Sequence, residues 1–182
     1  MLIAMVLTRS QAMERLKINS GPQLSKLLAT GLLASLEEAE VDALAAWPLL
    51  NLESDEYGIA VHLGSYQQEM VTDSNGASQA RWFGWELGNP MGLTQPEIEQ
   101  GWVGYWPVSK ARATELRGGF LVGSIAGFIP NELVRRIDGH ESFPIDETSR
   151  IVFEVRKPDR RALKRIGNTR IVARPGGIWQ TL

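Results

Sequence analysis

The sequence predicts an α+β protein, with a small helical segment at residues 1–50 and a β-rich domain at residues 55–182. Apolar residues recur at helical spacing in the first segment and alternate with polar residues after residue 57. The stretch 51–56 between them is polar and acidic, which is typical of a boundary. Because short strands outnumber helices after residue 57, we expect the second domain to be a β-barrel or a strongly bent sheet.

Two short helices joined by a turn are expected first, as a helix-turn-helix-like segment. Thr8 and Gln11 form a capping-box pattern at the start of the first helix. Ser20 can cap the second helix, where Pro22 suits the first turn, and Gly31 ends it. The apolar residues that would face inward are Ala12, Leu16, Leu24, Leu27 and Leu28. This arrangement is the outline of a helix-turn-helix.

A third helix is expected over residues 35–50, ended by Pro48, and the remaining elements are mostly strands. The strands are expected at residues 57–63, 67–72, 80–87, 120–129, 133–137, 151–155 and 170–173, with an extended stretch at 103–108. The pair Asn75-Gly76 favours a hairpin turn between the second and third of these strands. Thr94, Ser109 and Pro158 mark the starts of short helices.

Residues 7–35, LTRSQAMERLKINSGPQLSKLLATGLLAS, resemble the helix-turn-helix of excisionase-like and MerR-like DNA-binding proteins. The resemblance implies that the second helix enters the major groove of DNA. The residues that would read bases are Gln23, Ser25 and Lys26, and those that would contact phosphates are Arg9, Arg15 and Lys17. Where those families carry a basic wing, residues 37–42 of this chain are acidic. The alternative is a helical hairpin that packs on the rest of the protein.

Charge is segregated along the chain. Residues 1–35 carry a net charge of +3, residues 36–100 of −11 and residues 101–182 of +6. Basic ends around an acidic middle indicate a polyanionic partner, with nucleic acid the leading candidate. The basic C-terminal region contains Arg156, Lys157, Arg160, Arg161, Lys164 and Arg165, which on a helix would form i,i+4 rows suited to a phosphate backbone. The alternative is that these residues balance the acidic middle, within one molecule or across a dimer.

The order of elements after residue 57 resembles that of PUA-like barrels, the group that includes EVE and ASCH domains. The segments that carry the resemblance are YWPVS, GFLVGSIAGFI, VRRIDG and IVFEV, with a short helix after the first. The resemblance implies binding of RNA or of a modified base in an aromatic pocket. The aromatic residues that could supply stacking faces are Trp82, Trp102, Tyr105 and Trp106. The alternative is that these side chains belong to the core.

Few enzymatic chemistries are compatible with the composition. The chain has two histidines and no cysteine, which excludes disulfides, thiolate zinc sites and a cysteine nucleophile. P-loop, dinucleotide-binding and Gly-x-Ser-x-Gly motifs are absent from the sequence. One candidate chemistry is that of a Mg²⁺-dependent nuclease, in which Asp138, Asp146 and Glu154 hold the metal and His140 acts as the base. The alternative is that these acids lie in hairpin loops and on a strand surface.

We therefore expect a cytoplasmic nucleic-acid-binding protein that catalyses no reaction, needs no cofactor and does not contact a membrane. DNA is expected over RNA, in a regulatory or mobile-element context, with a homodimer as one option. The cytoplasmic expectation rests on the lack of cysteine and of the roughly 18 consecutive apolar residues that cross a bilayer. The alternatives are the Mg²⁺-dependent nuclease and a non-catalytic protein-interaction domain.

Overall fold

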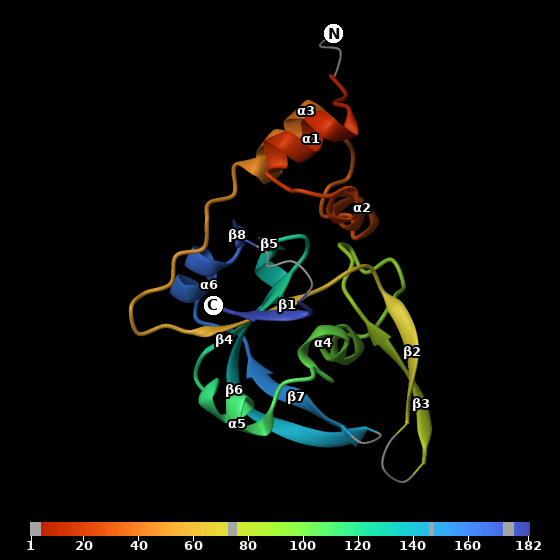
Figure 1. Ribbon diagram of the computed structural model, residues 1–182, viewed down its shortest axis with the longest axis vertical. Coiled ribbons are helices and arrows are strands. Elements are labelled where there is room, and N and C mark those ends of the chain that lie inside the picture. Colours follow the sequence, from red (N-terminus) through yellow and green to blue (C-terminus); the bar gives the residue numbers. More distant parts are fainter. Residues whose placement is uncertain (1–4, 73–75, 146–147, 173–176) are drawn as a thin grey trace.

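The computed structural model describes residues 5–72, 76–145, 148–172 and 177–182, and its fold is α+β. The N-terminal helices stand at one end of the molecule and most of the strands form the body below them (Figure 1). The helices are α1 Arg9–Leu16, α2 Gly21–Ala29, α3 Glu38–Ala45, α4 Gln95–Val103, α5 Lys110–Glu115 and α6 Arg160–Ile166. The strands are β1 Gly58–His62, β2 Gln67–Thr72, β3 Ser78–Phe83, β4 Phe120–Ser124, β5 Phe128–Ile129, β6 Val134–Ile145, β7 Thr148–Arg156, β8 Thr169–Arg170 and β9 Trp179–Thr181. None of the helices in the described part of the chain is long and apolar enough to span a membrane.

Local capping determines where α1 and α2 begin. The Thr8 hydroxyl accepts a hydrogen bond from the Gln11 backbone N–H at 3.3 Å, and the Gln11 side chain accepts one from the Thr8 N–H at 2.9 Å. This is the capping box that the sequence predicts. α2 begins after Ser20, as predicted, but the Ser20 hydroxyl does not cap the helix. The Gln23 side chain instead accepts a hydrogen bond from the Asn19 N–H at 3.0 Å, which ties the turn to the helix.

α3 covers only the middle of the helix expected over residues 35–50. On its N-terminal side the backbone pairs with the start of the chain, where Val6 forms a β-bridge with Glu37. On its C-terminal side Pro48 cannot continue a helix, and Leu49 forms a parallel bridge with Arg170 of β8. Backbone pairing with distant segments therefore replaces the expected helix at both ends.

The main sheet has the strand order β7-β6-β4-β1-β9. β1 and β4 are parallel, and the other neighbouring strands are antiparallel. β7 and β9 are its two edges, so the described strands form an open sheet, and the expectation of a closed barrel is wrong. The bent sheet is the alternative that remains, and the pairing of β6 with β7 shifts register between Ile137 and Gly139, as at a bulge, a feature that bends strands.

Several elements differ in extent from the prediction. β3 ends at Phe83, earlier than expected, because Gly84 adopts a φ of +106° and turns the chain. The expected extended stretch 103–108 begins inside α4, whose last turn buries Trp102. β6 and β7 form a longer hairpin than predicted, β8 is shorter, and β9 is a strand that the sequence does not predict. The predicted turn at Asn75-Gly76 lies partly outside the described residues.

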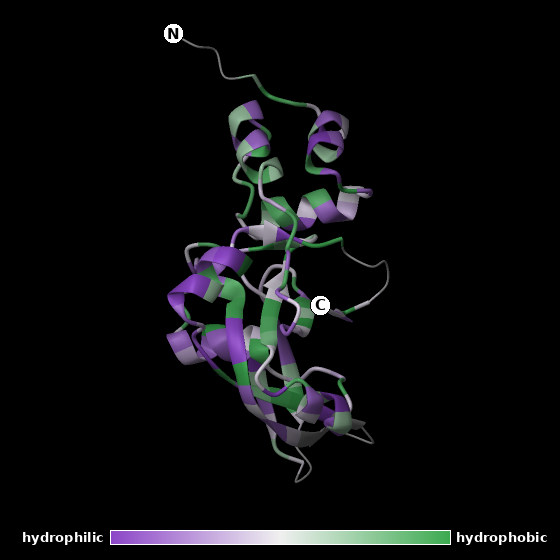
Figure 2. Cartoon of the chain, turned by 90° about the vertical axis from the view of Figure 1, so that its left-hand side faces the viewer, coloured by the Kyte–Doolittle hydropathy of each residue, from purple (hydrophilic) through white to green (hydrophobic). Residues whose placement is uncertain are grey.

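One buried apolar cluster connects the N-terminal helices with the sheet. It contains Leu24 of α2, Leu44 of α3, Leu121 of β4 and Phe128 of β5. The Trp47 ring packs edge-on against Phe128, with ring centroids 6.0 Å apart. A smaller cluster lies between the sheet and α6. Figure 2 shows apolar and polar sides on the N-terminal helices, as expected for helices that pack on one side only.

Because Phe128 belongs to the cluster that both parts share, we expect Phe128→Ala to lower the free energy of unfolding by about 3–5 kcal/mol. Urea unfolding, followed by far-UV circular dichroism and by tryptophan fluorescence, measures this loss and should show one shared transition. The control is Leu49→Ala, at a side chain that is 58% exposed, which should change stability by no more than about 0.5 kcal/mol. Separate transitions for the helices and the sheet would contradict a shared core.

Candidate nucleic-acid interface

A groove lies between the turn that joins α1 to α2 and the short strands β5 and β8. Its volume is about 230 Å³. It is lined by Leu16, Lys17, Ile18, Asn19, Gln23, Leu49, Ala126, Gly127, Phe128, Arg170, Ile171 and Val172. We refer to this surface as the junction groove, because residues from both ends of the chain meet in it.

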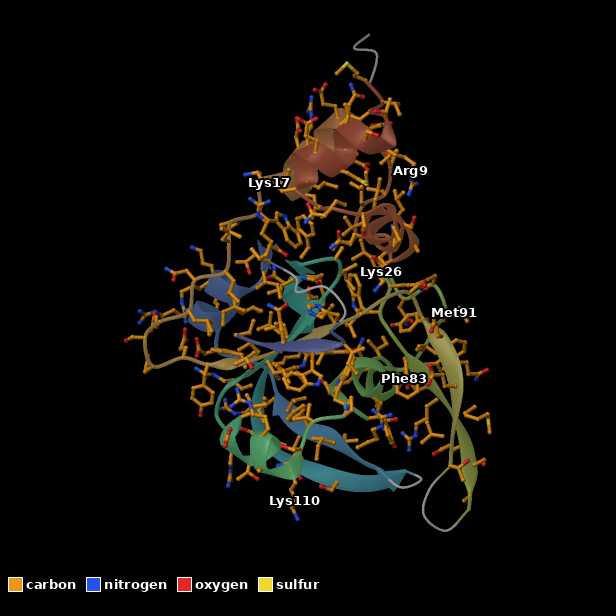
Figure 3. All side chains as sticks on the ribbon, in the orientation of Figure 1. Arg9, Lys17, Lys26, Phe83, Met91 and Lys110 are labelled. Atoms are coloured by element: carbon orange, nitrogen blue, oxygen red, sulfur yellow. The ribbon has the colours of Figure 1, made fainter. Side chains whose placement is uncertain are left out.

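The end of α1 positions the helical wall of the junction groove. Lys17 caps α1 in the left-handed conformation, with a φ of 55°, and its backbone N–H donates to the Glu14 carbonyl at 3.1 Å. The exposed Lys17 side chain therefore lies at the end of α1 nearest to the body of the molecule (Figure 3). Gln23, from the first turn of α2, lines the same wall.

Arg170 belongs to the opposite wall, and its backbone is bonded on both sides. On one side Arg170 lies opposite Phe128 in the pairing of β8 with β5. On the other side its N–H donates to the Pro48 carbonyl at 2.8 Å, and its carbonyl accepts from the Leu50 N–H at 2.8 Å. The side chain is half-buried, and its Nε is buried without a hydrogen-bond partner among the described residues. Such a donor is expected to meet an acceptor from water or from a ligand.

The junction groove is positively charged. Lys17 and Arg170 supply the charge, and none of the described residues that line the groove is acidic. Asn19 and Gln23 add amide groups beside them. Ammonium and guanidinium groups are the usual protein donors to phosphate oxygens. The arrangement can therefore hold an anionic group that also presents apolar surface to the remaining lining residues.

Four of the predicted phosphate-contacting cations are held in ion pairs within the chain. The pairs are Arg15 with Glu38 and Asp42, both at 2.7 Å, Arg156 with Asp138 at 2.8 Å, Arg161 with Glu53 at 3.4 Å and Arg165 with Glu53 at 3.6 Å. Arg165 also makes a bidentate contact with Glu56, whose side chain is only 9% exposed. These hydrogen bonds hold the pKa of Glu56 below its ordinary range and raise the pKa of Arg165. Arg15, Arg161 and Arg165 therefore balance the acidic middle within one molecule, whereas Arg156 pairs with an acid of its own C-terminal segment.

The other predicted cations are exposed and form no ion pair within the described part of the chain. They are Arg9, Lys17, Lys26, Lys157, Arg160 and Lys164. Arg9 donates to the hydroxyl of Ser25 at 2.9 Å. Ser25, which is predicted to read bases, is therefore hydrogen-bonded within the chain. Lys17 is well separated from Arg9 and Lys26 in the view of Figure 3. α6, which carries Arg160 and Lys164, directly precedes β8 and lies beside it (Figure 1).

The predicted nuclease residues do not form a metal site in the described structure. Asp138 is ion-paired with Arg156, and His140 and Glu154 lie on the neighbouring strands β6 and β7. Asp146 lies outside the described residues. Within the described ranges, no group of three or more His, Asp or Glu side chains could hold a metal ion. The geometry therefore offers no observation that favours a nuclease.

The four predicted pocket aromatics do not line one cavity. Trp102 is 1% exposed, and its carbonyl accepts a hydrogen bond from the Trp106 indole at 2.8 Å. Tyr105 packs edge-on against Phe83, with ring centroids 6.0 Å apart. Trp82 lines a small cavity of about 100 Å³ beside α4. Trp102 belongs to the main apolar cluster, and Trp106 packs against it. For these two residues, the alternative that they are core side chains therefore applies.

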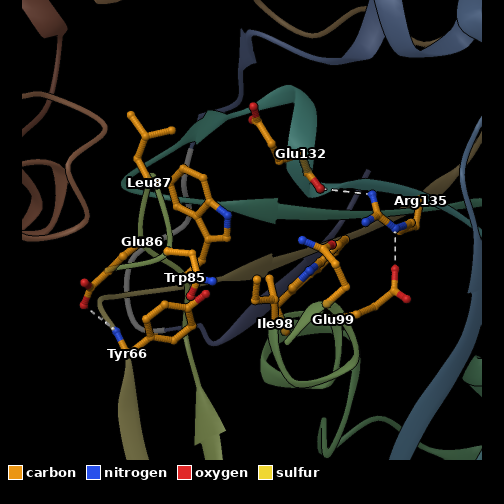
Figure 4. Close-up of a pocket in the computed structure, with 12 residues that line it drawn as sticks. Tyr66, Trp85, Glu86, Leu87, Ile98, Glu99, Glu132 and Arg135 are labelled. Atoms are coloured by element: carbon orange, nitrogen blue, oxygen red, sulfur yellow. Dashed lines mark hydrogen bonds and ion pairs between the residues drawn. The ribbon is translucent and has the colours of Figure 1, made fainter. Parts of the chain in front are cut away.

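A second cleft beside α4 has a volume of about 230 Å³, larger than the cavity at Trp82 (Figure 4). The sequence does not predict this cleft. We refer to it as the aromatic cleft. It is lined by Tyr66, Trp85, Glu86, Leu87, Gly88, Asn89, Gln95, Ile98, Glu99, Trp102, Glu132 and Arg135. Only Trp102 of the four predicted aromatics lies in this lining. The sequence analysis does not identify Trp85 as a pocket residue, because the alternation of apolar and polar residues places it on a strand. In the structure β3 ends before Gly84, and Trp85 lies in the following loop.

Comparison with known proteins leaves the function to be argued from this geometry. No family model, curated protein or solved structure matches the chain. The class that the fold defines is an α+β protein with an open mixed sheet and a helical N-terminal segment.

The Arg165–Glu56 contact tests how strongly the acidic stretch holds α6. We expect Glu56→Gln to lower the free energy of unfolding at neutral pH by about 1–3 kcal/mol, because the Arg165 guanidinium loses its bidentate charged partner and keeps only the longer contact with Glu53. Folding lowers the pKa of Glu56. Its stabilising contribution is therefore present above the ordinary carboxyl pKa and is lost as the pH falls through the lowered value.

Urea unfolding of the wild type and of Glu56→Gln over a pH series measures both effects. The wild type should lose more stability than the variant as the solution becomes acidic. Glu14→Gln, at an exposed glutamate of α1, is the matched control and should behave as the wild type. Identical stability and identical pH dependence in wild type and Glu56→Gln would show that the contact does not hold α6.

Proposed function

We propose that the protein binds nucleic acid, DNA in preference to RNA, and catalyses no reaction, in a regulatory or mobile-element context in the cytoplasm. The observation that supports this most is the junction groove, where Lys17 and the partly buried Arg170 meet with no acidic lining residue in the described structure. The groove joins the two parts of the chain that carry net positive charge. The charge segregation of the sequence and the geometry of the groove therefore agree.

In this proposal a backbone phosphate contacts Lys17 and Arg170. The amides of Asn19 and Gln23 would bond the neighbouring sugar or base, and the apolar residues of the groove would pack against it. A volume of about 230 Å³ suits one nucleotide unit and not a duplex. The groove would thus hold a single strand, or one strand at a duplex end.

Further phosphate contacts would come from α6. Lys164 and Arg160 are exposed, and α6 leads directly into β8. The ion-paired Arg165 would stay bound to the acidic stretch. Because so few phosphates are neutralised, binding by one molecule would be weak, and its affinity would fall with salt with a log–log slope of only a few units. A homodimer would double the contacts and raise the affinity.

The test is a fluorescence-anisotropy titration of labelled single-stranded DNA, duplex DNA and RNA of one sequence, at about 50 and about 200 mM salt. We expect Lys17→Ala to weaken binding about three- to tenfold at the lower salt concentration and to reduce the log–log salt slope by about 1. Lys110→Ala, on α5 far from the groove, is the matched control and should bind as the wild type (Figure 3).

Three outcomes would count against the proposal. They are an absence of salt-dependent binding to any of the nucleic acids, equal losses in Lys17→Ala and Lys110→Ala, and cleavage of the nucleic acid in a parallel series with Mg²⁺. The last outcome would replace the binding protein by the nuclease that the sequence leaves open.

A further inference from the structure

The aromatic cleft is separate from the junction groove. It lies among the loop after β3, helix α4 and the start of β6, and the two share no lining residue. Its apolar walls include the indole of Trp85, which is 4% exposed, and the indole of Trp102. A cavity with aromatic walls and several polar groups is a common form of ligand site.

One half of the cleft already contains an organic cation supplied by the chain. The guanidinium of Arg135 lies 5.3 Å from the centre of the Trp102 ring. Its Nε donates to the Glu99 carboxylate at 2.6 Å, and its Nη1 donates to the Glu132 carbonyl at 3.0 Å. The Arg135 side chain is only 14% exposed, so the aromatic face and the carboxylate hold it in place together. Figure 4 shows Arg135 with Glu99 and Glu132 on one side of the cleft.

The other half also contains aromatic side chains and a carboxylate, and none of the described residues that line it is a cation. Tyr66, Trp85 and Glu86 line this half, and Figure 4 shows the Glu86 carboxylate at the backbone end of Tyr66. The Glu86 carboxylate accepts a hydrogen bond from the Tyr66 backbone N–H at 3.0 Å but forms no ion pair with the described residues. The Tyr66 hydroxyl is buried and has no hydrogen-bond partner in the described structure. A buried hydroxyl oxygen without a donor is suited to accept a bond from an ammonium group, and the nearby charge of Glu86 favours a cation there.

The electrostatics of the cleft favour a cation. Glu86, Glu99 and Glu132 line it against the single positive charge of Arg135. Burial raises the pKa of Tyr66, and the charge of Glu86 raises it further, so the hydroxyl stays neutral at physiological pH. An anion would meet this negative field, whereas a cation would also gain from the aromatic faces. The volume of about 230 Å³ admits one small amine.

We propose that the aromatic cleft binds an alkylammonium group, which donates to the Tyr66 hydroxyl and lies against Trp85, within the electrostatic field of the Glu86 carboxylate. The ligand is a small free amine. A lysine side chain of another protein has the same chemistry, and the test separates the two sources. The proposal does not depend on nucleic-acid binding at the junction groove.

The test is a titration followed by the indole N–H signals of the ¹⁵N-labelled protein, with the Trp85 signal assigned through Trp85→Phe. The probes are n-butylammonium, its neutral counterpart n-butanol, and N-acetyl-lysine methylamide. We expect a saturable shift of the Trp85 signal with n-butylammonium and none with n-butanol. Saturation by the lysine derivative but not by n-butylammonium would overturn the free amine and assign the cleft to a protein side chain.

Variants identify the residues that bind. We expect Tyr66→Phe to weaken n-butylammonium binding about tenfold, the effect of losing one charge-assisted hydrogen bond, and Glu86→Gln to weaken it about threefold through the loss of a nearby negative charge. Glu141→Gln, at an exposed glutamate of β6, is the matched control and should bind as the wild type. Thermal unfolding confirms that each variant is folded. Equal affinity for n-butylammonium and n-butanol, or equal affinity in Glu86→Gln and Glu141→Gln, would overturn the proposal.

Discussion

Residues 48–56 connect α3 to β1 and include the acidic stretch 51–56. They are bonded to β8 and α6, and the arrangement of the two ends of the chain depends on this contact. Backbone hydrogen bonds join Pro48 and Leu50 to Arg170, and both Nη atoms of Arg165 donate to the Glu56 carboxylate. Because Pro48 and Leu50 follow the end of α3 closely, these bonds also hold the N-terminal helices near β8. The shared apolar cluster then fills the interface, with Trp47 packed on Phe128.

This contact also decides which basic residues remain for a partner. The Arg165–Glu56 pair is largely shielded from water, so exchanging it for a phosphate would leave a buried carboxylate unpaired. The Arg161–Glu53 pair is different, because the Arg161 side chain is 86% exposed and its contact at 3.4 Å contributes little to stability. Arg161 could therefore turn to a phosphate at small cost. A polyanion would meet the outer face of α6 and the junction groove while the inner face of α6 stays occupied.

The sequence predicts the elements whose signals are local. The capping box at Thr8 and the N-caps at Thr94 and Ser109 are confirmed, as are the cores of most strands. The prediction fails where pairing with distant chain decides the outcome, as at the ends of α3 and at β9, which pairs with β1. The junction groove, too, depends on contacts between segments that are distant in the sequence. Charge segregation indicates that both basic ends act together, but only the fold brings Lys17 to Arg170 and pairs Arg165 with the acidic stretch.

Photocrosslinking tests whether nucleic acid occupies the junction groove, as we propose. Single-stranded DNA that carries a photoreactive group is crosslinked to the full-length protein, and the modified peptides are identified by mass spectrometry. If nucleic acid lies in the groove, we expect crosslinks within residues 16–23 and within residues 126–128 or 170–172, which form its two walls. Crosslinks confined to the β2–β3 hairpin or to α5 would contradict it.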